Sequence, residues 1–122
     1  MQAVHAAAVR ASLYKHNYYL YMFVERNVFH LKFGQARPAV AMWKAYLDKA
    51  HRENNNIHAR LFTDLSGRGY SLVLEQNFNT YAELEPGACP LVNRPDWKSF
   101  YEEFIPLCES TERTLYKLQV AF

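Results

Sequence analysis

The sequence predicts an α+β domain with a four-stranded antiparallel sheet and two main helices on one of its faces. Some segments alternate apolar and polar residues with a period of two, others repeat apolar residues with a helical period, and one glycine-containing turn separates two strands. Between Met22 and Leu118 these segments follow the order βαββαβ, which is two strand–helix–strand units joined by a hairpin. The second sheet face is left bare, so we expect it to be covered by a partner in a homodimer.

The first half of the unit contains a strand, a helix and a second strand. Residues 21–33 alternate through Phe29, Leu31 and Phe33, and Gly34 follows them. Pro38 suits the first turn of a helix, which we expect to continue to Arg52 because apolar residues recur at helical spacing. The second strand is predicted to begin at Ile57.

The second half starts at a turn over residues 64–69, where Gly67 and Gly69 can adopt positive φ. We expect a strand over 70–78, then a short helix over 80–84 with Glu83 in a capping box. A longer helix is predicted from Pro95 through Cys108, broken or kinked near Pro106, and the last strand over 113–120.

Composition excludes several classes of function. The 122 residues carry a formal charge of +2 without a basic stripe, which argues against nucleic-acid binding. The longest apolar stretch, residues 18–24, is too short to span a membrane. Cys89 and Cys108 fit neither a metal nor a disulfide spacing, so we expect a reduced, cytoplasmic protein without a metal site or cofactor. No Ser-His-Asp order, catalytic carboxylate pair or phosphate-binding glycine loop is present.

Residues 1–21 differ from the rest because they are rich in alanine and lack acidic side chains. They could form an amphipathic targeting helix, but one arginine and one serine give that reading little support. We expect an N-terminal extension over 1–21 and a single domain over 22–122.

Three segments carry a family resemblance: residues 25–34, the strand-to-helix step over 74–84, and residues 96–101. They resemble the dimeric α/β-barrel superfamily, especially its NIPSNAP-like members. The resemblance implies two ferredoxin-like protomers packed sheet against sheet, each with a pocket between its sheet and its helices. The group also resembles antibiotic-biosynthesis and haem-degrading monooxygenases, where an Asn seven residues before the strand-ending glycine is functional. Asn27 has that spacing from Gly34, whereas Asn77 replaces an expected Trp and the expected helix His is missing, which argues against haem breakdown.

Asn27, a set of aromatic residues and the opposite sheet face are candidates for binding. Asn27 has the same strand phase as Phe29, so we expect its side chain on the helix side of the sheet. There it could bind a substrate carbonyl or enolate, or it could form hydrogen bonds with buried backbone groups of a loop. Six aromatic residues could line an apolar ligand cavity or form plain core: Trp43, Tyr46, Tyr81, Trp97, Tyr101 and Phe104. The opposite sheet face is expected to form the dimer interface through Arg26, Val28, His30, His58, Arg60, Phe62, Val73 and Glu75.

Two functions remain open. The first is a dimer that binds a small apolar molecule between sheet and helices and catalyses no defined reaction. The second is a cofactor-independent monooxygenase-like enzyme acting on a small aromatic substrate, with Asn27 as the best catalytic candidate and Tyr81 or Tyr101 as a second polar group.

Overall fold

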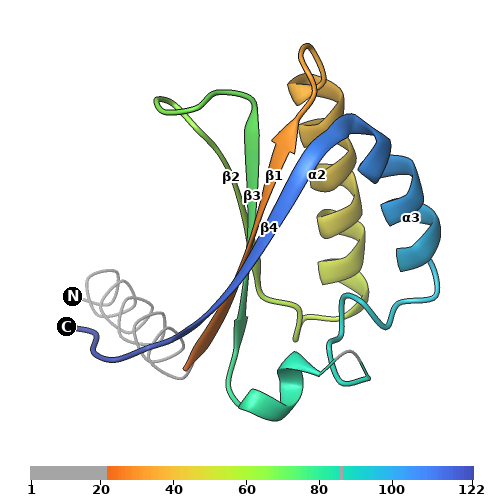
Figure 1. The fold of residues 1–122 in the computed structure, drawn as a ribbon. Helices are drawn as coiled ribbons and strands as arrows, with labels where there is room; N and C mark the ends of the chain where they lie inside the picture. Colours follow the sequence, from red (N-terminus) through yellow and green to blue (C-terminus); the bar gives the residue numbers. More distant parts are fainter. Residues whose placement is uncertain (1–21, 86) are drawn as a thin grey trace, which may run out of the picture.

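The computed structural model describes residues 22–85 and 87–122, and the predicted extension over 1–21 lies outside them. The elements, in chain order, are β1 (Phe23–Leu31), α2 (Ala36–Glu53), β2 (Ala59–Thr63), β3 (Ser71–Phe78), η1 (Tyr81–Leu84), α3 (Trp97–Phe104), η2 (Ile105–Leu107) and β4 (Cys108–Lys117). The strands form one antiparallel sheet in the order β2-β3-β1-β4. Both α2 and α3 cover the same face of that sheet (Figure 1), so the predicted ferredoxin-like α+β fold is confirmed.

Strand β1 lies at the centre of the sheet and fixes which residues share a face. Asn27 stands opposite Leu74 of β3 and Arg113 of β4. Because side chains alternate along a strand, Asn27, Phe29 and their paired neighbours point toward the helices. Val28 stands opposite Val73 of β3, and these residues point to the uncovered face, which we call the open face.

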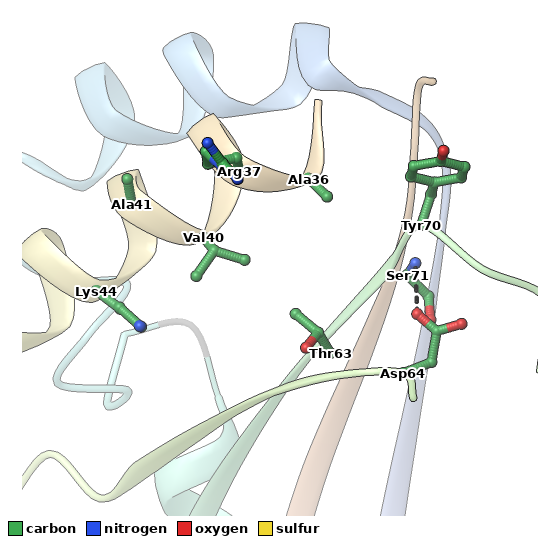
Figure 2. A pocket seen from close by; sticks show the side chains of 9 residues that line it. All are labelled: Ala36, Arg37, Val40, Ala41, Lys44, Thr63, Asp64, Tyr70 and Ser71. Atoms are coloured by element: carbon green, nitrogen blue, oxygen red, sulfur yellow. Dashed lines mark hydrogen bonds between the residues drawn. The ribbon is translucent and has the colours of Figure 1, made fainter. Parts of the chain in front are cut away.

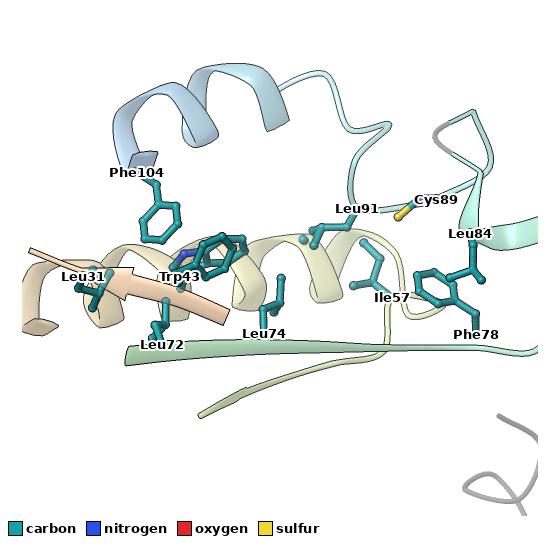
Figure 3. Close-up of a cluster of buried hydrophobic side chains, with 13 residues drawn as sticks. Leu31, Trp43, Ile57, Leu72, Leu74, Phe78, Leu84, Cys89, Leu91 and Phe104 are labelled. Atoms are coloured by element: carbon teal, nitrogen blue, oxygen red, sulfur yellow. The ribbon is translucent and has the colours of Figure 1, made fainter. Parts of the chain in front are cut away.

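The core lies between the sheet and the layer of α2 and α3. Trp43 of α2 and Phe104 of α3 are fully buried, and their rings lie 5.3 Å apart. Phe29 of β1 contacts both rings, at 5.8 and 4.8 Å. Figure 3 shows the buried cluster extending from Leu31 and Phe104 at one end to Phe78, Leu84 and Cys89 at the other. Apolar side chains therefore fill the space beneath the two helices.

The predicted second helix and last strand differ from the structure. Helix α3 spans only Trp97–Phe104, and Cys108 begins β4 and does not belong to a helix. Pro106 explains the difference, because it cannot donate a helical hydrogen bond and its ring disfavours a continued α-helix. The chain passes through η2, whose Leu107 carbonyl accepts a hydrogen bond from Lys32 N–H at 2.8 Å. Strand β4 therefore starts at residue 108 and ends at Lys117.

The other predicted boundaries are correct to within about two residues, and local backbone geometry explains the shifts. Strand β1 ends at Leu31, three residues before Gly34, which has φ 78°. Strand β3 begins at Ser71 because Tyr70 has φ 53°, in the left-handed region. Glu83 accepts a hydrogen bond from Asn79 N–H at 3.2 Å, so the capping interaction reaches one residue before Thr80.

Candidate functional site

A cavity of about 430 Å³ lies on the helix side of the sheet, where residues 81–85 and 87–92 lie against β1 and β4. Neither α2 nor α3 contributes to its wall. It is lined by Glu25, Tyr81, Leu84, Glu85, Cys89, Val92, Arg113 and Leu115. Its volume falls in the usual range of small-molecule sites.

An ion pair lies in the cavity wall. Glu25 of β1 is only 8% exposed, and its Oε2 accepts a hydrogen bond from Nη2 of Arg113 at 2.8 Å. Its Oε1 accepts a hydrogen bond from Nδ2 of Asn27 at 2.8 Å. A buried carboxylate requires such donors to offset its lost hydration. Two donors thus hold Glu25 in a fixed orientation.

Arg113 is the cation that the cavity offers to a ligand. Its side chain is 54% exposed, and Nη2 is the atom that binds Glu25. A guanidinium has five N–H donors, so one bond to Glu25 leaves several of them for a second acceptor. Arg113 can therefore bind a carboxylate, an enolate or a carbonyl oxygen while it remains paired.

The other walls are mainly apolar. Leu84, Val92 and Leu115 supply aliphatic surface, and Tyr81 contacts Phe23 edge to face at 6.0 Å. The thiol of Cys89 lies 3.8 Å from Oε1 of Gln76. Burial raises the pKa of Cys89, so the side chain stays a neutral thiol at neutral pH and is a poor nucleophile.

The structure separates the predicted ligand-binding residues into two groups. Tyr81 lines the cavity, and Asn27 reaches it through Glu25. Trp43, Trp97 and Tyr101 belong to the aromatic packing of α2 and α3. Contact between these three rings and a ligand stays a prediction.

Tyr46 connects the two helices. Its hydroxyl donates a hydrogen bond to Oδ1 of Asp96 at 2.8 Å, and burial together with Asp96 raises its pKa to about 12. Arg94 also binds Asp96, at 3.1 Å, and Glu53 of α2 at 2.7 Å. This network gives Tyr46 a structural role, and ligand binding by it stays a prediction.

Sequence reasoning missed Glu25 and Arg113. Glu25 has the same strand phase as Asn27, so alternation alone places an acidic side chain on the buried face. Arg113 shares the phase of Leu115, but its contact with Glu25 depends on the register of β4 against β1. That contact joins residues 88 positions apart, and no local pattern reveals it.

The open face has its own ion cluster. Glu75 of β3 is 5% exposed and binds Arg26 of β1 and Arg60 of β2, both at 2.8 Å. Arg26 lies over the ring of Tyr116 and Arg60 over the ring of Phe62. The predicted meeting of Arg60 and Glu75 is thus correct.

Two histidines were also expected in that cluster. His30 lies at the far end of β1, where its Nε2 is 3.7 Å from Oε1 of Glu112. His58 precedes β2, and its pKa is lowered by burial and by His51 of α2, against an opposing effect of Glu83 of η1. Participation of His58 in the open-face cluster stays a prediction.

The part of the chain that the structure describes contains neither a metal-binding cluster nor a membrane-spanning helix. No group of three or more His, Cys, Asp or Glu side chains there could hold a metal ion. Within the same residues, no helix is both long and apolar enough to cross a membrane.

Comparison with known proteins gives matches to solved structures. No model of a known protein family matches the sequence, and no curated protein sequence is similar to it. A NIPSNAP domain protein from Burkholderia xenovorans has TM-score 0.68 and 20% identity, over 83% of this chain and 97% of the other. A NIPSNAP family protein from Agrobacterium tumefaciens has TM-score 0.67 and 14% identity, over 81% and 87% of the two chains.

A third solved structure is a mutant of SnoaB, a cofactor-independent oxygenase from Streptomyces nogalater. It has TM-score 0.62 and 12% identity, and the match covers 81% of this chain and 94% of the other. Identities this low establish a shared fold only. The chain therefore has the α+β fold of NIPSNAP-domain proteins and of the oxygenase SnoaB.

Proposed function

We propose that this protein is a homodimer in which each protomer binds a small, mainly apolar molecule in the cavity next to Glu25 and Arg113. The observation that carries the proposal is the buried Glu25 carboxylate, held by Asn27 and Arg113 in the wall of a cavity of about 430 Å³. Burying a carboxylate in a strand is costly, and a plain core would place an apolar side chain there.

The cavity suits a ligand with one oxygen acceptor on an apolar body. Arg113 would bind the oxygen with the N–H groups that Glu25 does not use, and Asn27 would keep the ion pair oriented. Leu84, Val92 and Leu115 would contact the body of the ligand. Asn27 is thus a positioning residue in this proposal.

The dimer is inferred from the open face. Val28 and Val73 are half-buried at the centre of this face, and Phe62 and Tyr116 are 42% and 46% exposed. The cluster of Arg26, Glu75 and Arg60 lies beside them. Aromatic and arginine side chains are enriched in protein interfaces, and a sheet face of this kind favours burial against a second copy. The two unpaired cysteines agree with a reducing location, and we place the protein in the cytoplasm.

Native mass spectrometry of protein purified from its own host tests the ligand. We expect one bound small molecule per protomer, lost or reduced at least tenfold in Arg113→Gln and weakened in Asn27→Ala. Arg68→Gln, an exposed arginine in the turn after β2, is the matched control and should keep the ligand. Empty wild-type protomers, or equal loss in Arg68→Gln, would contradict the proposal.

A second candidate function is that of a cofactor-independent oxygenase acting on a small aromatic compound. It is favoured by the fold shared with SnoaB and by the position of Tyr81 on the cavity that Asn27 reaches through Glu25. Oxygen uptake would be measured with a panel of hydroxylated aromatic compounds. Uptake above the rate without protein, and reduced in Tyr81→Phe and Asn27→Ala, would favour the enzyme; uptake no faster than without protein would leave the binding function alone.

A further inference from the structure

We propose a second binding site, for an organic anion with a small aromatic or aliphatic body, between α2 and the β2 edge of the sheet. A cavity of about 520 Å³ lies there (Figure 2). It shares no lining residue with the cavity next to Glu25, so its occupant and the function proposed above can be tested separately.

The cavity exists because the helix overhangs a short edge strand. Ala39, Trp43, Tyr46 and Ala50 form the buried stripe of α2. The neighbouring stripe, Arg37, Val40, Ala41 and Lys44, has the spacing of a single helix face. It faces β2, which has only five residues and ends at Thr63. Arg37, Ala41 and Lys44 are exposed and Val40 is only partly buried, so the short strand leaves most of this stripe uncovered.

The charges on this helix stripe favour an anion. Arg37 and Lys44 both line the cavity, and neither has an ion-pair partner among residues 22–85 and 87–122. Figure 2 shows Lys44 extending from α2 toward Thr63. The single carboxylate of the wall, Asp64, accepts hydrogen bonds from the backbone N–H groups of Gly69 at 2.6 Å and Ser71 at 3.1 Å. Because two cationic side chains line the cavity and only one carboxylate does, its wall carries a net positive charge.

The rim of the cavity holds a strained aromatic residue. Tyr70 has φ 53°, which is rare for a bulky side chain. The two bonds to Asp64 fix the residues on either side of it, and its carbonyl accepts a hydrogen bond from Leu31 N–H at 2.7 Å. Strain of this kind concentrates at ligand sites when surrounding contacts enforce it.

Tyr70 and the helix provide the apolar part of the site. Tyr70 is 46% exposed and its ring lies 5.3 Å from that of Phe33, and Val40 points into the cavity in Figure 2. An aromatic or short aliphatic body would contact the ring and Val40, and its anionic group would bind Lys44 and Arg37. A carboxylate and a phosphate ester share this chemistry.

Titration of the full chain with phenyl phosphate, followed by ¹H–¹⁵N correlation spectra, tests the site. We expect saturable shifts in residues 36–44 and 63–71, and tighter binding than inorganic phosphate. The double variant Arg37→Gln/Lys44→Gln should weaken binding at least tenfold. Ala41→Leu, which narrows the cavity without changing charge, should also weaken it, whereas Lys98→Gln on α3 should not.

Four results would overturn the proposal. They are the absence of saturable shifts, equal affinity for phenyl phosphate and inorganic phosphate, binding of benzylamine in preference to phenyl phosphate, and shifts confined to residues 81–92 and 113. The last result would place the anion in the first cavity. A different outcome separates the two proposals. If native mass spectrometry finds no ligand in the first cavity while phenyl phosphate still shifts residues 36–44 and 63–71, the proposed function is refuted and the second site stands.

Discussion

Val73→Asp tests the proposed dimer most directly, because residue 73 lies at the centre of the open face. Val73 stands opposite Val28 on one side and Phe62 on the other. In a monomer the new carboxylate is hydrated, and we expect the loss of strand propensity to cost about 1 kcal/mol of folding stability. In a face-to-face dimer the same carboxylate would be buried in each protomer.

The expected effect on the dimer follows from that burial. An uncompensated buried charge costs about 3–5 kcal/mol, which we reduce to about 2 kcal/mol per protomer because Val73 is only half-buried in the protomer and arginines lie nearby. Two protomers lose about 4 kcal/mol, which raises the dissociation constant about a thousandfold. A dimer with micromolar affinity would become a monomer at ordinary concentrations.

Sedimentation velocity over a hundredfold range of protein concentration measures this change. Val73→Thr, which keeps the shape of the side chain without charge, is the matched control and should remain dimeric. A Val73→Asp protein that sediments as an unchanged dimer would show that this face is not the interface. A wild-type monomer would refute the dimer itself.

Three further predictions concern stability. Trp43→Ala should lower the free energy of unfolding by about 3–5 kcal/mol, because Trp43 is fully buried; a loss below about 1 kcal/mol in urea denaturation would contradict the described core. Hydrogen bonds from Arg94 and Tyr46 hold the pKa of Asp96 well below its usual value, so the ionised carboxylate stabilises the folded protein. That contribution to folding stability is present above about pH 4 and is lost as pH falls through the lower native pKa. Asp96→Asn should therefore be less stable than wild type by about 1 kcal/mol at pH 7, a figure already reduced because Asp96 is partly exposed. The difference in stability should shrink below about pH 4, and equal differences at pH 7 and pH 2.5 would refute this. Deletion of residues 1–21 should shift the melting temperature by no more than about 3 °C, because the buried cluster of the described residues comes from positions 29–104; loss of the cooperative transition would contradict the assigned domain start.

Local sequence patterns were sufficient for the fold because each element carries its own signal. The alternation of Phe29 and Leu31, the helical spacing of Trp43 and Tyr46, and the glycines of the turn each specify one element without reference to the others. The error at Cys108 arose where two signals compete, since apolar residues at helical spacing continue past Pro106 while the proline itself ends the helix.

The candidate site was only partly accessible from the sequence. The phase of Asn27 places it on the helix side, but the spacing of aromatic residues cannot distinguish a ligand cavity from a packed core. Trp43 illustrates this, because its ring is enclosed by other aromatic rings, while neither α2 nor α3 lines the cavity next to Glu25. The pairing of Glu25 with Arg113 depends on strand register, which joins the first strand to the last.

The position of β1 also constrains when this protein can fold. Both neighbours of β1 come later in the chain: β3 pairs with one of its edges, and β4, the last strand, pairs with the other along nearly its whole length. During synthesis the edge of β1 that binds β4 must therefore stay hydrated until β4 has left the ribosome exit tunnel. Such long-range closure is slow, because the strands that it joins lie far apart in the sequence.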